Sequence, residues 1–127
     1  MPHLFPHLRA LFPALLLLLA LGVAQPSRAA FVPGTEDVPL APGLTATVDD
    51  TLVFDNPTGR IVQATATGAA DADAVTRFYA DTLPQLGWTR GSDGRWVRAG
   101  EVLDIGIALD AARRLTVRFQ LSPRAER

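Results

Sequence analysis

Residues Asp71–Trp88 carry the one helical pattern that stands out in this sequence, and a single helix among strands leaves few folds open to the chain. At 100° per residue, the large apolar side chains of this segment fall on one face. The opposite face carries Asp73, Arg77 and Asp81, whose i,i+4 spacing places opposite charges next to one another. The segment therefore predicts an amphipathic helix with one buried side. The residues of that side are Val75, Phe78, Tyr79, Leu83 and Leu86.

Both ends of this helix carry residues that favour helix termini. Asp71 can accept a hydrogen bond from the first turn, and Gly87 can adopt the left-handed conformation that ends a helix. Trp88 is then expected to fold back onto the last turn. Because Pro84 lacks an amide hydrogen and its ring crowds the carbonyl group of Ala80, we expect the helix to bend or to end early there.

The chain after the helix has the pattern of strands and turns. Val102–Asp110 and Leu115–Leu121 alternate strictly between apolar and other side chains, which predicts strands with one buried face and one solvent-facing face. The turn residues Gly91–Gly94 separate two shorter segments, which predicts a hairpin. The arms of that hairpin are Trp88–Arg90 and Arg95–Ala99.

Two further strands are predicted before the helix, Thr51–Phe54 and Arg60–Thr67, joined by the turn Asp55–Gly59. The predicted fold class is therefore α+β, with the order β-β-α-β-β-β-β. A single amphipathic helix would pack on one face of an antiparallel sheet of about five or six strands. We expect this helix to cover the apolar face, and we expect the sheet to be unstable without it.

The segment Met1–Ala29 is predicted to be a Sec-type signal peptide. It combines a basic start, the apolar run Leu11–Val23 and small residues before Ala30, so cleavage is predicted after Ala29; a cut after Ala24 is the alternative. A retained membrane anchor is the other alternative, although the apolar run is short against the about 20 residues that a spanning helix needs. We expect a periplasmic or secreted protein that meets the membrane only through this leader before cleavage.

Composition divides the rest of the chain into three parts. Residues 30–50 are rich in proline and glycine and predict an extended arm lying over the domain, with Val38, Leu40 and Leu44 as anchors; a disordered linker is the alternative. Residues 51–122 form the predicted α+β domain. Residues 123–127 form a polar tail.

The composition also restricts the chemistry open to the protein. The chain has no cysteine, all 12 basic residues are arginine, and both histidines, His3 and His7, lie in the predicted leader. The usual neutral-pH base and the thiolate and imidazole metal ligands would therefore be missing after cleavage. Ten arginines against 13 acids make the remainder net negative, which gives no case for nucleic-acid binding. We predict no catalytic residue, cofactor or metal site.

Three aromatic residues, Trp88, Trp96 and Tyr79, are the candidates for a binding surface. The two tryptophans flank the hairpin turn, where they could stack on each other or on a sugar; a cross-strand pair that pins the hairpin is the preferred interpretation. Tyr79 is interpreted as a core tyrosine with its hydroxyl at the rim rather than as a catalytic group. The arginines of the C-terminal part alternate with acids and predict an ordinary charged solvent face: Arg95, Arg98, Arg113, Arg114 and Arg118.

Four segments resemble a group of small exported proteins from alphaproteobacteria: VPLAPGL, FDNPTGR, FYADTLPQLGW and RAGEVLDI. The pattern of that group is roughly VPLxPGL, FDxPxGR, FYxxxLPxLGW and RxGExL, and the resemblance covers nearly all of the chain after the leader. It implies export and a common architecture. It supplies no active site, so no functional residue is carried over.

These observations favour a non-catalytic exported binding or envelope-assembly module, whose partner would be an envelope protein or a small ligand. The alternatives are a small carboxylate-based enzyme or enzyme inhibitor, and a carrier of an apolar ligand between helix and sheet. A deep polar pocket would favour the enzyme, and an empty apolar cavity would favour the carrier. A packed core with an exposed apolar patch would favour the module.

The leader generates the first testable prediction. N-terminal sequencing of the protein isolated from the envelope of an exporting host should begin at Ala30, or at Gln25 if the alternative site is used. A protein that still begins at Met1 and is extracted only with detergent would show that the segment is a retained anchor.

Overall fold

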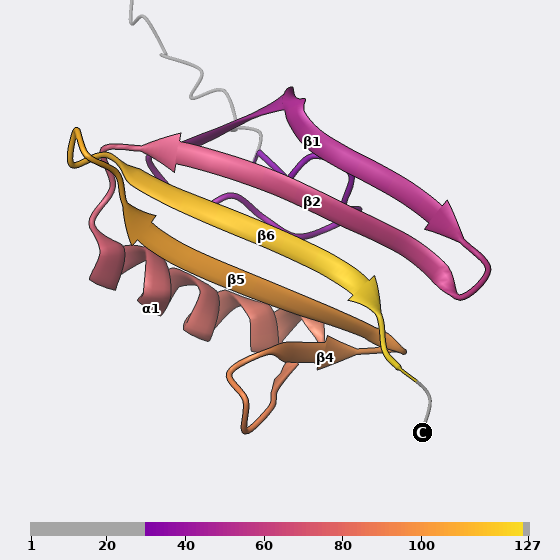
Figure 1. Ribbon diagram of the computed structural model, residues 1–127. Helices are drawn as coiled ribbons and strands as arrows, with labels where there is room; N and C mark the ends of the chain where they lie inside the picture. Colours follow the sequence, from indigo (N-terminus) through magenta and orange to yellow (C-terminus); the bar gives the residue numbers. More distant parts are fainter. Residues whose placement is uncertain (1–29, 126–127) are drawn as a thin grey trace, which may run out of the picture.

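A six-stranded antiparallel sheet with the spatial order β1-β2-β6-β5-β4-β3 is the frame of the protein (Figure 1). The computed structural model describes residues 30–125, so the predicted leader and the last two residues lie outside the described part. The order of elements along the chain is β-β-α-β-β-β-β, and the predicted α+β fold is confirmed. The elements are β1 Leu44–Asn56, β2 Gly59–Gly68, α1 Ala72–Thr82, the 3₁₀ helix η1 Leu83–Leu86, β3 Thr89–Arg90, β4 Trp96–Arg98, β5 Glu101–Leu109 and β6 Leu115–Pro123.

The helix begins and ends where its sequence predicts. The Asp71 side chain accepts a hydrogen bond from the amide of Ala74 at 3.1 Å, which caps α1. The α-helix stops at Thr82, and Pro84 lies in the tighter turn η1, where its missing amide hydrogen is tolerated. Gly87 has a φ of 90°, in the left-handed region that ends such a turn. The amide of Trp88 then donates to the Leu83 carbonyl at 3.0 Å, so the chain folds back as expected.

The alternating pattern of the two long C-terminal strands is also confirmed, except at Leu109, which is 62% exposed at the end of β5. In β6, Leu115, Val117, Phe119 and Leu121 are buried, while Arg118 and Gln120 between them are exposed. The register places Leu103 opposite Leu121 and Ile105 opposite Phe119, so β5 and β6 present one apolar face together. The buried side of the helix packs on this face: Val75, Tyr79 and Leu83 are buried, and Phe78 and Leu86 are partly buried.

The helix covers only part of this apolar face, because it is narrower than the sheet. A helix with its side chains is about 10–12 Å across, whereas six strands at about 4.8 Å spacing span roughly 24 Å. In Figure 1, α1 runs along β5, and the segment before β1 passes behind β2. The helix is therefore one part of the cover, and a second element must complete it.

Residues 30–43 supply the rest of the cover. Val32, Val38 and Ala41 are buried members of the core, and Leu40 packs partly against it. The segment folds back on itself through a bridge between Phe31 and Pro39, with the amide of Val32 donating to the Val38 carbonyl at 2.8 Å. Residues 30–43 therefore form a packed arm and not a disordered linker.

The arm lies close against β1 and β2. A Cβ atom on Gly34 would come within 2.9 Å of Val62 and 3.0 Å of Val53, and Gly34 has a φ of +83°. Glycine is therefore required here both by the backbone conformation and by the close approach. This contact fixes the arm under the β1–β2 side of the sheet, beside the region that α1 covers.

The first strand begins at Leu44 and not at Thr51, which corrects the predicted boundary. The pairing with β2 runs through Ala46 opposite Ala66, and then resumes with Thr51 opposite Ala64. Residues 47–50 of β1 thus lie opposite a single residue of β2 and form an enlarged β-bulge. The bulge interrupts the alternation on which a strand is recognised in a sequence, and this interruption hid the first half of β1.

A matched pair of variants tests whether the arm belongs to the core. Val32→Ala should lower the free energy of unfolding by about 2 kcal/mol, because it removes buried methyl groups and leaves a cavity. Val48→Ala, the same change at the exposed tip of the bulge, should alter it by less than about 0.5 kcal/mol. Urea unfolding measures both. Equal values for the two variants would show that the arm is not packed.

Candidate functional site

The exposed edge of the sheet at β1 is the candidate site. In the described part of the chain, β1 pairs with β2 on one side and has no strand on the other. The opposite edge, β3, is only two residues long. An unpaired edge presents rows of backbone donors and acceptors that can bind another strand, and proteins normally keep such edges short or charged.

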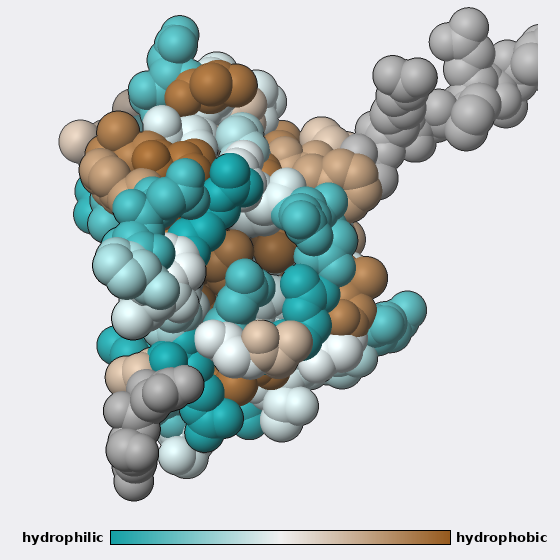
Figure 2. Space-filling model, turned by 90° about the vertical axis from the view of Figure 1, so that its right-hand side faces the viewer, coloured by the Kyte–Doolittle hydropathy of each residue, from teal (hydrophilic) through white to brown (hydrophobic). Residues whose placement is uncertain are grey.

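Large apolar side chains are concentrated on this edge strand. Among residues 30–125, six large apolar side chains are exposed, and four of them belong to β1. The exposed fractions are 78% for Val48, 55% for Leu52, 42% for Val53 and 50% for Phe54. Figure 2 shows hydrophobic residues gathered in the upper part of its view, at the height of β1. This cluster makes the edge strand the candidate for an interaction surface.

The apolar residues of β1 lie on both faces of the sheet. Val53 is opposite the buried Val62 and belongs to the covered face. Leu52 is opposite Gln63 and Phe54 is opposite Ile61, so both belong to the open face. We call Leu52, Val53 and Phe54 the apolar edge. A partner strand that pairs with β1 would meet apolar groups above and below the new hydrogen bonds.

The structure limits the length of this edge at both ends. On one side the bulge of residues 47–50 is held by two hydrogen bonds, from Thr47 Oγ1 to Asp50 Oδ2 and from Thr51 Oγ1 to the Thr47 carbonyl, each 2.9 Å long. On the other side the hairpin turn begins at Pro57, which has no amide hydrogen to donate. Regular pairing is therefore open to residues 51–56.

A second feature, the open face of the sheet, is hollowed and polar. A depression of about 420 Å³ is lined on this face by Leu52, Gln63, Thr65, Arg118 and Gln120, with Asp50 at its rim. A second hollow of about 410 Å³ adjoins Arg118 beside Gly106 and Thr116. Asp50 is the only acid that lines the first hollow, so it offers no pair of carboxylates for acid–base catalysis.

The structure places the three aromatic candidates in the core. The exposed fractions are 2% for Trp88, 6% for Trp96 and 3% for Tyr79, so none of them forms an exposed binding surface. The register places Trp96 opposite Arg90, and not opposite Trp88, so the expected tryptophan pair is wrong. Each indole ring is covered by an arginine instead. The Arg98 guanidinium lies 4.3 Å from the Trp88 ring centre, and that of Arg90 lies 5.6 Å from the Trp96 ring centre.

Tyr79 joins the helix to the arm. Its hydroxyl donates to the Pro39 carbonyl at 2.9 Å and accepts from the amide of Ala41 at 3.1 Å. Its ring makes an edge contact with Phe119, at 5.7 Å between centres. Burial raises the pKa of Tyr79 to about 12, so the phenol stays protonated at neutral pH. The hydrogen bonds of the hydroxyl, the ring contact and the raised pKa all agree with the interpretation of a core tyrosine.

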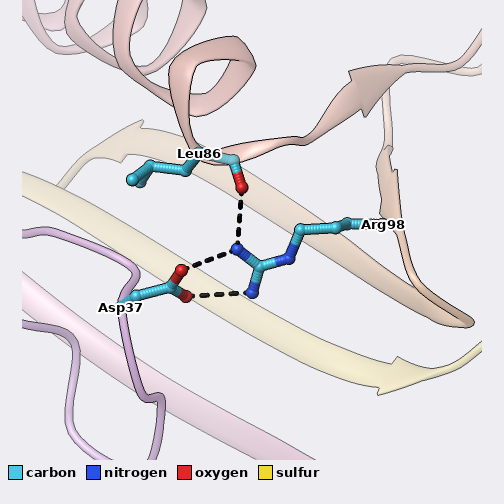
Figure 3. A network of polar contacts seen from close by, with 3 residues as sticks. All are labelled: Asp37, Leu86 and Arg98. Carbon is cyan, nitrogen blue, oxygen red and sulfur yellow. Dashed lines mark hydrogen bonds and ion pairs between the residues drawn. The ribbon is translucent and has the colours of Figure 1, made fainter.

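Arg98 holds three distant segments together (Figure 3). Its guanidinium donates to both carboxylate oxygens of Asp37, at 2.7 and 2.9 Å, and also to the Leu86 carbonyl at 3.0 Å. The arm, the end of η1 and β4 therefore meet at one side chain. The sequence predicted Arg98 to lie on a solvent face and did not single out Asp37. No local pattern could have identified the pair, because the two residues are 61 positions apart.

The ion pair shifts the protonation equilibria of both residues. The hydrogen bond from Arg98 lowers the pKa of Asp37 below its usual 3.8, against the opposing effect of partial burial. The same hydrogen bond raises the pKa of Arg98. Bidentate pairing of this kind is the strongest form of a charged contact between side chains.

In residues 30–125, no group of three or more histidine, cysteine or acidic side chains is placed to hold a metal ion. No helix in this part is long and apolar enough to cross a membrane.

Comparison of the chain with protein-family models, with curated proteins and with solved structures found no match. The resemblance to exported alphaproteobacterial proteins therefore stays a prediction.

The Asp37–Arg98 pair generates a prediction about stability and pH. Asp37→Asn should lower the free energy of unfolding at neutral pH by about 1 kcal/mol, because it removes the charge-assisted hydrogen bonds to Arg98. The loss stays this small because the pair is partly exposed to solvent. The folded-state pKa lies below the unfolded value of about 3.9. The stabilisation by the Asp37–Arg98 pair is therefore complete above the unfolded-state pKa and is lost as the pH falls through the folded-state pKa. Urea unfolding should show wild type and variant converging below about pH 4.

Asp104→Asn is the matched control. Asp104 pairs with Arg95 at 3.7 Å, and both side chains are more than half exposed, so its loss should change the free energy by less than about 0.5 kcal/mol. Equal losses in the two variants, or a difference that does not depend on pH, would contradict the assigned role of Asp37.

Proposed function

We propose that this protein is a non-catalytic exported binding or envelope-assembly module that joins other polypeptide through the edge strand β1. The observation that carries the proposal is the apolar edge, Leu52, Val53 and Phe54, beside an open row of backbone groups. An exposed apolar patch is the feature that favours a binding module over a small enzyme or a carrier of an apolar ligand. The expectation of export rests on the predicted leader.

Strand addition is the mode of binding that this geometry supports. An extended segment would pair with residues 51–56 through main-chain hydrogen bonds, while its side chains pack beside Leu52 and Phe54 on the open face and Val53 on the covered face. Backbone pairing supplies affinity, and the apolar side chains supply selectivity. This mode needs no histidine, cysteine, lysine or metal.

Charge restricts the partner. The strand carries Asp49, Asp50 and Asp55 and no basic residue, and Asp55 pairs with Arg60 of β2 at 3.6 Å across the hairpin. A strongly acidic strand would therefore be repelled along much of its length. The proposal is for an apolar strand that sets no acid opposite the acids of β1.

Photocrosslinking in an exporting host tests the proposal. A photoreactive phenylalanine in place of Leu52 should give a discrete crosslinked product of higher mass, because this side chain faces the site. The same group in place of Ser92, in the exposed turn between β3 and β4, is the control and should give none. Mass spectrometry then identifies the polypeptide joined to the Leu52 position. The same products from both positions, or none from either, would overturn the proposal.

A further inference from the structure

We infer that the polypeptide received by β1 is a second copy of this chain, so that two β1 strands pair antiparallel about a two-fold axis near Val53. The inference rests on the proposed function, because it names the occupant of the same edge. Two six-stranded sheets would become one continuous sheet, with both helices on the same side.

The first argument is the matched length of the open segments. The bulge of residues 47–50 and the turn at Pro57 leave residues 51–56 free for regular pairing. In an antiparallel pair of identical strands centred on Val53, residues 51–55 pair with residues 51–55, and each bulge begins opposite Asn56, the last residue of the other strand's open segment. The two interruptions therefore do not collide.

The second argument is the register. A two-fold axis perpendicular to the sheet keeps the open faces together, so each residue must face one from the same side of the strand. With Val53 opposite Val53 of the second copy, Leu52 faces Phe54 of that copy, and Phe54 faces Leu52. Both open-face residues of the apolar edge are then covered by each other across the axis.

The alternative registers are worse. A shift by one residue would place open-face side chains opposite covered-face ones. A shift by two in one direction places Val53 opposite Asp55, and in the other direction places Asp50 opposite Phe54. Each of these sets an acid beside an apolar group. The apolar matching therefore selects one register.

The third argument is charge. In the selected register Asp55 faces Thr51 and Asp50 faces Asn56, so no acid stands opposite an acid. This holds although β1 carries three acids and no base. Pairing with itself thus avoids the repulsion that the strand would meet against most acidic partners.

Sedimentation equilibrium of the purified exported protein tests the inference. The wild type should show a concentration-dependent dimer. Val53→Lys should weaken the dimer at least about tenfold, because it sets two ammonium groups opposite each other. Val48→Lys, on the bulge outside the pairing segment, is the matched control and should leave the dimer unchanged. Mixing Val53→Lys with Val53→Glu should restore a dimer that contains both chains.

A second pair of variants covers the case in which a charge at Val53 disturbs the arm, since Val53 lies close to Gly34. Leu52→Glu and Phe54→Lys are on the open face, and each alone should weaken the dimer. Their mixture should form a heterodimer, because Leu52 of one copy faces Phe54 of the other. Circular dichroism confirms that each variant is folded before it is compared.

Two outcomes would overturn the inference. One is a wild type that stays monomeric at every concentration. The occupant of the edge would then be another protein, or residues 1–29 of this chain, and not a second copy. The other is folded single variants whose mixtures recover no dimer. If the wild type is monomeric while the Leu52 crosslink still captures a different envelope protein, this inference fails and the proposed function stands.

Discussion

The apolar face of a sheet that is wider than one helix is the constraint on which this structure depends. Burial of that face stabilises by about 25 cal/mol for each Å² removed from water, and the net stability of a small domain is only about 5–15 kcal/mol. The helix covers the side of β5 and β6, and the arm covers the side of β1 and β2. The proline-rich arm is therefore part of the core.

Two polar contacts position this double cover. Tyr79 on the helix bonds the arm at Pro39 and Ala41, and Arg98 on β4 bonds the arm at Asp37. Apolar packing has little directional preference, whereas these hydrogen bonds require defined atoms at defined distances. They fix where the arm lies on a surface that would otherwise accept several positions. Tyr79, one of the three aromatic candidates for a binding surface, and Arg98, which the sequence placed on a solvent face, thus hold the fold together.

The same architecture leaves one edge unprotected. The arm passes beneath β1 and β2 but does not extend the sheet, so among residues 30–125 β1 stays an edge strand. The bulge blunts the first half of that edge. The second half keeps Leu52, Val53 and Phe54 exposed, although an edge strand with apolar residues on both faces invites association. This exposed half is the part of the edge on which the proposed function rests.

The sequence by itself determined the elements and their order, because the spacing of apolar residues at 3.6 or 2 positions is a local property of helix and strand. It also determined the caps at Asp71 and Gly87, which depend on neighbouring residues alone. It did not reveal the candidate site, since exposure of the apolar edge follows from the place of β1 in the strand order. Only the tertiary structure decided that Asp37 meets Arg98. Contacts between residues far apart in the chain arise when separate elements pack, and no local pattern records them.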